Sequence, residues 1–507
     1  MFYTMADHEI VPEAISIADL RLDSVPRTSR SSTTASSSSV GDLCSSPSSP
    51  LPLPLTSSEL ELQDLTPWDL IVVGFGPASL SIAIAILDTL PRESRQTFRM
   101  LFLEKQSEFH WHGGMLLPHA RMQISFIKDF ATMRNPTSRF TFMNYLHANG
   151  RLLSFVNLGT FYPLREEYED YMRWCADLVQ QEAGCVMYGE TVVELATPEQ
   201  ECFPPEKIPY FAVTSSPTCD LSRRITRLAR NVVLCPGARP RFPQCFPKEL
   251  PSIICHSAQF LYRLTALLNL ASQSTTAQFS VAVVGAGQSA AEIAQYLNAH
   301  LPLSSRIDMI IPTRALRPSD DSPFVNEIFN PEAVDGIYSL PDDRRRKMFE
   351  DHKATNYSVV RSDLLETLYA TVYAQQLPGH QTRLRIKNSK SVVEAKVVAQ
   401  QSCEKVKLKL VDRYDPGCIE TEYYDFVVAA TGYDNSVIVC ELLSELKPYL
   451  PANEVVVDRG YRAKLDENIE ARLWVQGCNE MTHGLSDTLL SIMAVRAKEI
   501  VDQIFNK

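Results

Sequence analysis

Two stretches of the sequence constrain the fold most, because each has the pattern of a strand, a glycine turn and a helix. The first is WDLIVVGFGPASLSIAIAIL, from Trp68 to Leu87, and the second is FSVAVVGAGQSAAEIAQYL, from Phe279 to Leu297. An apolar strand, a G-x-G turn and a helix form the dinucleotide-binding unit of doubly wound parallel sheets. The sequence therefore predicts an α/β protein with two Rossmann-like dinucleotide-binding domains.

The first glycine turn predicts a pyrophosphate site. Glycines allow a tight turn and let a pyrophosphate approach the backbone at the helix N-terminus. The next strand, FRMLFLE, ends in a glutamate whose carboxylate suits the ribose hydroxyls of an adenosine. The alternative is a glycine turn that serves only helix–strand packing. The residues expected to bind the dinucleotide here are Gly74, Gly76, Pro77, Ser79 and Glu104.

The second glycine turn predicts a nicotinamide dinucleotide that carries a 2′-phosphate. The strand after it, RIDMIIPTRALRP, ends without a carboxylate and offers Arg314 instead. An arginine in place of the acid accommodates a 2′-phosphate, so this site should prefer NADPH to NADH. The alternative is that Arg314 and Arg317 are solvated surface residues. The turn residues expected to bind NADPH are Gly285, Ala286, Gly287, Gln288 and Ser289.

Composition excludes several other functions. The net charge of −11 over 507 residues argues against nucleic acid as the main partner. No run of about 18 apolar residues and no signal or transit pattern are present, which predicts a cytoplasmic protein without a membrane span. The 12 cysteines form no C-x-x-C pair, and neither metal-ligand spacing nor a G-x-S-x-G elbow occurs. Two dinucleotide sites usually mean a flavin and a nicotinamide, which leaves the flavin to do the chemistry, most simply by activating oxygen.

Four segments are expected along the chain. The Ser-, Thr- and Pro-rich residues 1–66 have little to bury and are predicted to be a disordered tail. The FAD-binding domain is expected at 67–242 and again at 426–507. The NADPH-binding domain, 243–425, lies between them and includes a substrate-binding insertion at about 318–375. The stretches NVVLCPGARP and YDFVVAATGYD are predicted to mark the crossings between the domains.

Longer motifs resemble one family. MQISFIKDFAT, FTFMNYLHANGRL, EYEDYMRWCA, RPSDDSPFVNEIFNPE, KATNYSVV and HGLSDTLLS resemble the fungal L-ornithine N-monooxygenases of siderophore biosynthesis, and the resemblance extends from about Trp68 to the C-terminus. It implies FAD, NADPH, molecular oxygen, L-ornithine and a homotetramer. In such an enzyme reduced flavin adds oxygen to give a flavin hydroperoxide, and the terminal amine of ornithine attacks its distal oxygen. No side chain is expected to be catalytic.

The resemblance also assigns further site residues. Ornithine would contact Lys128, Asn326, Glu327, Ile328, Phe329, Asn356 and Ser491. The flavin would additionally contact Lys105, Gln106, Ser107, Glu108, Phe109, His110, Trp111, His112, Gln123, Thr488, Leu489 and Leu490. NADPH would additionally contact Asn356, Tyr357 and Ser358. One position departs from the family, because its usual arginine after the second turn aligns here with Pro312. Arg314, two residues further on, is expected to take over the phosphate contact.

Lys128 is the site residue whose role follows most directly from its surroundings in the sequence. It lies in RMQISFIKDFATMRNP among apolar and aromatic side chains, where an ammonium needs a partner. Asp129 is adjacent in sequence and projects in a different direction, so it is a poor candidate for that partner. We therefore expect Lys128 to bind the α-carboxylate of the substrate. The alternative is a lysine that reaches solvent or pairs with a distant acid.

Other polar residues have simpler interpretations. Ser486 and Asp487 are N-cap types, which predicts that they begin the last helix and that its N-terminus faces the flavin. Asp320 and Asp321 are expected to be solvated or capping residues, and a structural role is expected for the histidines His256 and His483.

Two rival functions remain open, and the sequence disfavours a third. A lysine N-hydroxylase needs a pocket one methylene longer, worth only about 1–3 kcal/mol of discrimination. A general flavin-containing or Baeyer–Villiger monooxygenase carries an F-x-G-x-x-x-H signature, which the stretch IICHSAQFLY lacks. A non-catalytic dinucleotide-binding sensor would share the glycine turns.

Overall fold

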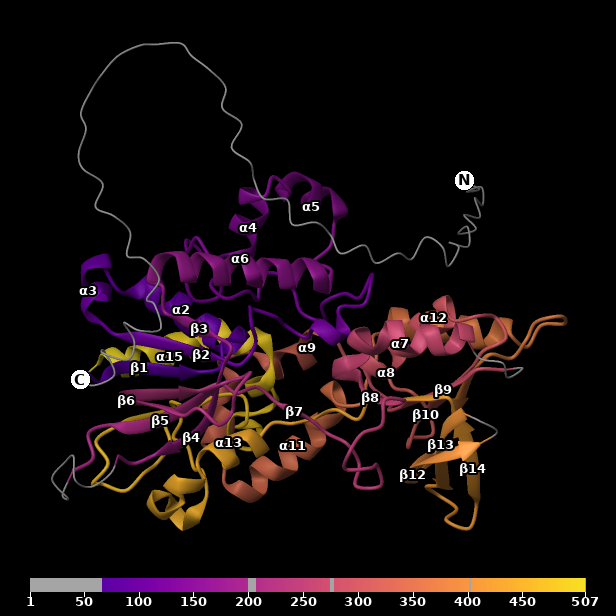
Figure 1. The fold of residues 1–507 in the computed structure, drawn as a ribbon. Coiled ribbons are helices and arrows are strands. Elements are labelled where there is room, and N and C mark those ends of the chain that lie inside the picture. Colours follow the sequence, from indigo (N-terminus) through magenta and orange to yellow (C-terminus); the bar gives the residue numbers. More distant parts are fainter. Residues whose placement is uncertain (1–65, 199–206, 274–277, 401–402, 507) are drawn as a thin grey trace, which may run out of the picture. The chain divides into compact units, whose positions relative to one another are not determined.

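Two sheets, the first mixed and the second parallel, organise the part of the chain that the structure describes. The computed structural model describes residues 66–198, 207–273, 278–400 and 403–506 (Figure 1). Almost all of the predicted tail, residues 1–65, lies outside the described residues. Both predicted strand–turn–helix units are present, and the predicted α/β class with two Rossmann-like domains is confirmed.

The first sheet contains seven strands in the order β3-β2-β1-β6-β5-β4, with β17 also paired to β6. The strands β3, β2, β1, β6 and β17 run parallel, whereas β4 and β5 form an antiparallel extension. The apolar runs of β1 and β2 are buried, as parallel strands covered on both faces require. Its strands are β1 (Trp68–Val73), β2 (Met100–Glu104), β3 (Val186–Tyr188), β4 (Glu190–Ala196), β5 (Phe211–Pro217), β6 (Ile225–Leu234) and β17 (Arg472–Val475).

Two helices from opposite ends of the described chain pack together beside this sheet. Helix α2 (Pro77–Thr89) follows the first glycine turn, and α15 (Met493–Phe505) is the last helix; Figure 1 shows them side by side in indigo and yellow. Ser81 Oγ donates a hydrogen bond to the Met493 carbonyl at 3.0 Å. The start of the last helix therefore lies beside the second turn of α2. The other helices here are α3 (Arg92–Thr97), η2 (Gly113–Met115), α4 (Phe142–Ala148), α5 (Leu152–Leu158) and α6 (Arg165–Ala183), where η denotes a 3₁₀ helix.

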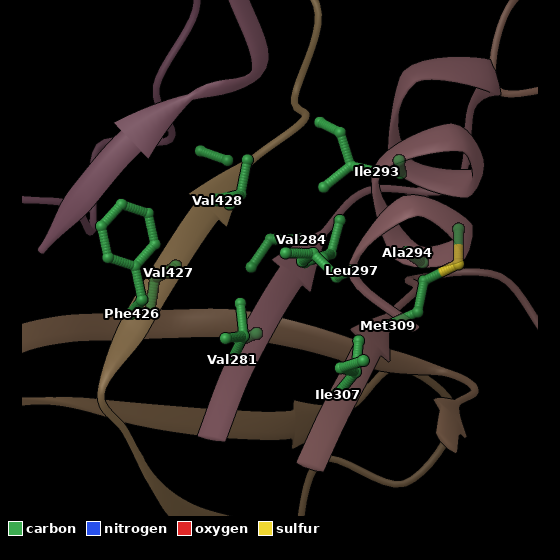
Figure 2. Close-up of a cluster of buried hydrophobic side chains, with 14 of the residues drawn as sticks. Val281, Val284, Ile293, Ala294, Leu297, Ile307, Met309, Phe426, Val427 and Val428 are labelled. Carbon is green, nitrogen blue, oxygen red and sulfur yellow. The ribbon is translucent and has the colours of Figure 1, made fainter. Parts of the chain in front are cut away.

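The second sheet is entirely parallel, in the order β11-β10-β9-β15-β8. Figure 2 shows its core, in which Val281 and Val284 of β9 pack with Ile293 and Leu297 of the following helix. Strand β9 is a continuous buried apolar run, and Ile293 and Leu297 are four residues apart on one face of α8, which is the pattern of a strand–turn–helix unit. The elements are β8 (Ile254–His256), η4 (Ser257–Gln259), α7 (Phe260–Gln273), β9 (Ser280–Val284), α8 (Gln288–His300), β10 (Arg306–Ile310), β11 (Leu384–Lys387) and β15 (Phe426–Ala429).

A helical insertion and a small antiparallel sheet interrupt the second unit. The insertion lies between β10 and β11, and the strands β12, β13 and β14 form the antiparallel sheet. The insertion contains α9 (Pro323–Asn326), η5 (Glu327–Phe329), α10 (Ala333–Tyr338), α11 (Asp342–Asn356) and α12 (Ser362–Ala374). The antiparallel strands are β12 (Lys390–Gln400), β13 (Cys403–Asp412) and β14 (Ile419–Tyr424).

The chain passes from the first sheet to the second and back through a two-stranded ribbon. Strands β7 (Arg239–Pro240) and β16 (Tyr433–Asp434) pair antiparallel, and each consists of the last two residues of one of the stretches predicted as crossings. Because β15 pairs with β9, the return to the first sheet lies after Ala429. The remaining elements are α13 (Val437–Leu442), η6 (Ser444–Tyr449), η7 (Pro451–Asn453), α14 (Glu480–His483), η8 (Leu485–Thr488) and η9 (Leu490–Ile492).

Candidate active site

The first glycine turn joins β1 to α2 and is shaped for a phosphate. Gly74 has a φ of +87°, and a Cβ there would lie 2.4 Å from the carbonyl oxygen of Cys235, so only glycine fits. Gly76 is the N-cap residue of α2, and no side chain accepts a hydrogen bond from the free N–H groups there. The space where a Cβ of residue 76 would lie is open. Pro77 and the buried Ser79 occupy the first turn of the helix. Uncapped N–H groups beside open space suit an anion at a helix N-terminus.

Glu104 is brought directly to this turn. Its carboxylate is buried and accepts hydrogen bonds from the backbone N–H groups of Phe75 at 2.7 Å and Gln106 at 2.8 Å. These bonds hold the end of β2 against the glycine turn. A carboxylate has about four lone-pair sites, so Glu104 can still accept from a ribose hydroxyl.

The loop after Glu104 continues along the same edge of the sheet. Phe109 is buried with its ring edge-on to Phe75, at 6.3 Å between ring centres, and Gln106 Nε2 donates to the His110 carbonyl at 3.4 Å. His112 adopts a left-handed conformation, with a φ of +50°, and its ring lies 6.1 Å from that of Tyr433 in the crossing ribbon. The remaining predicted residues here are the exposed Lys105, Ser107 and Glu108 and the partly buried Trp111.

The predicted cap of the last helix is wrong. Helix α15 begins at Met493, and Ser486 and Asp487 lie earlier, in η8. The Asp487 carboxylate accepts from Asn479 N at 2.7 Å and pairs with Arg496 at 2.9 Å, both side chains being almost fully buried. A buried guanidinium requires this partner, which removes Asp487 from any capping role.

The predicted flavin residues Thr488, Leu489 and Leu490 connect η8 to the start of α15. All three are partly buried, and the bond between Ser81 and Met493 holds this part of the chain beside α2. The predicted substrate residue Ser491 follows them, and its buried Oγ has no hydrogen-bond partner among the residues that the structure describes. A buried hydroxyl without a partner is uncommon and is consistent with a ligand at this position.

The second glycine turn repeats the geometry of the first. Gly285 has a φ of +146°, and a Cβ there would lie 2.2 Å from the carbonyl oxygen of Ala430. Gly287 is the N-cap of α8 and has no side-chain cap. A Cβ on Gly287 would lie 3.8 Å from the Cα of Ser358, which has a φ of +58°. The structure therefore brings the predicted segment 356–358 to the predicted NADPH turn, beside the buried Ala286.

Gln288 and Ser289 begin α8, and the Gln288 side chain is bonded within the protein. Its Oε1 accepts from Arg361 N at 2.9 Å, and its Nε2 donates to Glu292 at 2.8 Å. Glu292 in turn pairs with Arg165 of α6 at 2.7 Å. Gln288 therefore ties the turn to the segment after Ser358 and to a helix beside the first sheet.

Arg314 lies just beyond β10, in a turn held by a hydrogen bond from Ser389 N to the Thr313 carbonyl at 2.9 Å. The side chains of Arg314 and Arg317 are exposed, and neither forms an ion pair with any residue that the structure describes. Pro312 precedes this turn, so the local backbone differs from that of a strand ending in arginine. An unpaired guanidinium at this edge of the sheet suits a phosphate.

The predicted substrate residues of the insertion are brought to the flavin segment. Asn326 ends α9, and Glu327, Ile328 and Phe329 form η5. Both η5 and α11, which ends at Asn356, contact η8. Asn326 Nδ2 donates to the Asp321 carbonyl at 3.0 Å, which holds the start of the insertion in place.

Lys128 lies in a loop rather than in a helix or strand and is partly buried. Burial lowers the pKa of Lys128 below its ordinary value. Among the described residues, no side chain forms an ion pair with it. Asp129 is 2% exposed and accepts from the N–H groups of Ala131, Thr132 and Phe142, so the prediction that Asp129 is not its partner is confirmed. Lys128 is thus a partly desolvated cation with no acidic partner in the described part of the chain.

A hollow of about 220 Å³ lies between the loop that precedes Lys128 and the insertion. The predicted flavin residue Gln123 is exposed on its wall, and Arg361 donates to the Met122 carbonyl across it at 3.1 Å. Its lining residues are Met122, Gln123, Tyr162, Asp321, Arg361, Ser362 and Asp363. This polar lining includes both positively and negatively charged side chains.

The two histidines and the exposed aspartate singled out in the sequence have structural roles, as predicted. His256 Nε2 bonds the Gly432 carbonyl at 3.0 Å, and its Nδ1 accepts from Ala258 N at 3.1 Å. His483 is buried and stacks on Tyr461 with ring centres 4.2 Å apart. Asp320 is exposed and accepts from Ser322 N at 3.0 Å, at the start of α9.

Sequence reasoning missed Glu480. Its Oε1 accepts from Tyr357 Oη at 2.6 Å and from Thr488 Oγ1 at 2.6 Å. It therefore joins a predicted NADPH residue to a predicted flavin residue. Nothing in the local sequence marks it, because it occupies a short helix without periodicity or motif.

Two sheets, each with parallel strands that lead into an uncapped glycine turn, are joined by a double crossing. They define an oxidoreductase of the class with two dinucleotide-binding domains. The chain belongs to the L-lysine 6-monooxygenase/L-ornithine 5-monooxygenase family, whose model matches residues 66–435. No group of three potential metal ligands and no helix long and apolar enough to cross a membrane occur within the described ranges.

Curated relatives agree with this assignment. An L-ornithine N(5)-oxygenase from Arthrobotrys oligospora is 44% identical over 449 residues, which is 87% of this chain and 88% of the relative. An L-ornithine N(5)-monooxygenase from Arthroderma benhamiae is 44% identical over 456 residues, covering 86% of this chain and 88% of the relative.

Solved structures also resemble this chain. The ornithine hydroxylase of Pseudomonas aeruginosa is 36% identical, with a TM-score of 0.77 over 87% of this chain and 99% of its own. An ornithine N-hydroxylase from a Kutzneria species, whose structure carries reduced FAD, NADP⁺ and L-ornithine, is 33% identical, with a TM-score of 0.76 over 87% of this chain and 99% of its own.

Proposed function

We propose that this protein hydroxylates the terminal amine of L-ornithine, using FAD, NADPH and molecular oxygen. The observation that carries the proposal is the packing of η5 and α11 against η8, because it puts the residues expected for ornithine beside those expected for the flavin. Membership of the family and relatives named L-ornithine N(5)-monooxygenase support it.

The first dinucleotide site fits FAD. The N-terminus of α2 would hold the pyrophosphate, where Gly76 leaves open space, and Glu104 would hold the ribose. Bound FAD supplies the redox chemistry, by accepting hydride from NADPH and activating oxygen. The segment 488–490 would line the flavin beside α2.

The second dinucleotide site fits NADPH. The N-terminus of α8 would hold the pyrophosphate, and the exposed Arg314 would contact the 2′-phosphate. The segment 356–358 lies against Gly287 and would position the nicotinamide half.

Lys128 would bind the α-carboxylate of ornithine. It is a cation without an acidic partner among the described residues, and its partial burial strengthens an ion pair relative to one in water. The amide of Asn356 can both donate and accept, which suits a ligand bearing an ammonium and a carboxylate. The buried Oγ of Ser491 has unused bonding capacity at the flavin end of the same site.

A substrate screen tests the proposal. The purified protein, with its flavin, is incubated with NADPH and ornithine, lysine or small amines, and the hydroxylamine product is measured. We expect product and tightly coupled NADPH consumption with ornithine. Product with lysine instead would favour the rival hydroxylase, which sequence separates poorly because one methylene is worth about 1–3 kcal/mol. No product with any amine would favour a non-catalytic sensor.

We further propose a cytoplasmic homotetramer whose product enters the synthesis of a hydroxamate siderophore. The tetramer rests on the resemblance to the fungal enzymes. Sedimentation of the purified protein tests it, since a tetramer of 57.0 kDa chains separates clearly from a dimer or a monomer.

A further inference from the structure

Glu480 connects two parts of the site that are far apart in the sequence. It lies at the start of α14, partly buried, and one carboxylate oxygen accepts from the hydroxyls of Tyr357 and Thr488, each at 2.6 Å. Hydrogen bonds to an ionised acceptor are shorter and roughly twice as strong as neutral ones.

The segments that carry the two partners of Glu480 differ in how they are held in place. Thr488 belongs to η8, which the buried pair of Asp487 and Arg496 holds in place. Tyr357 follows the last residue of α11 and precedes Ser358, whose φ of +58° is unfavourable for a residue with a side chain. Backbone bonds of Val360 and Arg361 hold the segment after Ser358, and the bond from Tyr357 to Glu480 supports the strained turn on its other side.

The position of Tyr357 matters because its neighbour lies at the second glycine turn. The Cα of Ser358 is 3.8 Å from the position of a Cβ on Gly287, the N-cap of α8. A shift of the strained turn would move the wall of the dinucleotide site, whereas the first glycine turn would be unaffected.

We propose that Glu480 is a positioning residue, which ties the NADPH-side segment at Tyr357 to the flavin-side segment at Thr488. This inference rests on the proposed function for the identity of the two ligands. It assigns to Glu480 no contact with the reacting atoms. Its consequence is that loss of Glu480 weakens the binding of the nicotinamide dinucleotide more than that of the flavin.

The test measures NADP⁺ affinity by titration calorimetry on the FAD-loaded protein, without ornithine. We expect Glu480→Ala to weaken NADP⁺ binding about 10-fold or more, the scale for a hydrogen bond to a charged group. Glu480→Gln keeps an oxygen that accepts both hydroxyls, so it should restore most of the affinity. Glu470→Ala is the control, because this exposed glutamate pairs with the exposed Lys207, and the variant should bind NADP⁺ like wild type.

A double-mutant cycle separates positioning from direct contact. Tyr357→Phe should weaken NADP⁺ binding as Glu480→Ala does, and the double variant should be no worse than either single one, because both remove the same link. Additive losses would mean that the Tyr357 hydroxyl acts on the ligand by itself. That outcome, or wild-type affinity in Glu480→Ala, would overturn the proposal.

A general structural role has a different signature. It would lower thermal stability and FAD content in Glu480→Ala along with NADP⁺ affinity, and Glu480→Gln would not restore the affinity; this pattern also contradicts the proposal. If Glu480→Ala does not fold, the cycle is run with Glu480→Leu, which fills the space but accepts from neither hydroxyl, and Tyr357→Phe. Since the titration contains no ornithine, a wild-type protein that fails to hydroxylate ornithine would refute the proposed function and leave this measurement intact.

Discussion

Replacing Lys128 by alanine should selectively weaken the use of ornithine. The side chain is a partly buried cation, and no acid pairs with it in the part of the chain that the structure describes. Removing it should leave the first glycine turn and Glu104, and hence the flavin content, unchanged. Flavin reduction by NADPH in the absence of ornithine should also stay close to wild type.

The magnitude follows from the environment of the ammonium. Two charges 4 Å apart attract by about 4 kcal/mol at the effective dielectric constant of ~20 near a protein surface. Losing one partner of a buried charge pair costs roughly 2–5 kcal/mol, and the partial exposure of Lys128 favours the lower half of that range. We therefore expect kcat/KM for ornithine to fall about 30- to 400-fold.

The assay compares ornithine with putrescine, which lacks the carboxylate. Wild type should use putrescine poorly, and Lys128→Ala should reduce its use little further. Lys128→Met, which keeps the aliphatic stem, separates the charge from the packing. Equal losses for the two substrates, or loss of bound FAD, would refute the role in carboxylate binding and indicate a structural or flavin-side role.

The pH dependence gives a second check. Because burial lowers the pKa of Lys128, the ammonium is lost on the alkaline side at a lower pH than for a free lysine. The kcat/KM for ornithine should therefore fall as the pH rises through this pKa, and that alkaline limb should be absent in Lys128→Met. An alkaline limb of the same shape in both proteins would assign the titration to another group.

Three further predictions concern the glycine turns, the phosphate contact and acid stability. Gly74→Ala should lower the free energy of unfolding by roughly 1–3 kcal/mol, because Gly74 has a positive φ and lies close to the Cys235 carbonyl. Gly76→Ala should instead melt like wild type and bind FAD more weakly. Equal melting temperatures and equal FAD affinities in the two variants would contradict this. Arg314→Ala should reduce the NADPH-to-NADH ratio of kcat/KM about 10-fold, and an unchanged ratio would place the contact elsewhere. Burial lowers the pKa of His256 from 6.5 to about 4, so between these values the unfolded chain binds a proton that the folded chain does not, and stability should fall by up to about 3 kcal/mol as the pH falls. Denaturant titrations of wild type and His256→Asn check this, since the variant should lack that part of the acid destabilisation.

Much of the fold was predictable because local sequence carries the signal. The apolar runs at β1 and β9 are typical of parallel strands buried on both faces, and the first glycine after each run, Gly74 or Gly285, has a positive φ and a close approach that exclude a side chain. The residues of both turns, and Glu104 at the end of β2, could therefore be named from spacing alone. The isolation of Lys128 from Asp129 was also predictable, since neighbouring residues project in different directions.

The sequence by itself thus determined the two dinucleotide-binding units, the crossings between them and a cation in need of a partner. Only the tertiary structure decided that Asp487 pairs with Arg496 instead of capping the last helix, and that Gln288 bonds Arg361 and Glu292. It also decided that Glu480 joins Tyr357 to Thr488. The physical reason is that a turn or a strand is selected by residues within a few positions of one another. An ion pair or hydrogen bond between distant segments exists only after the sheets and the insertion have packed.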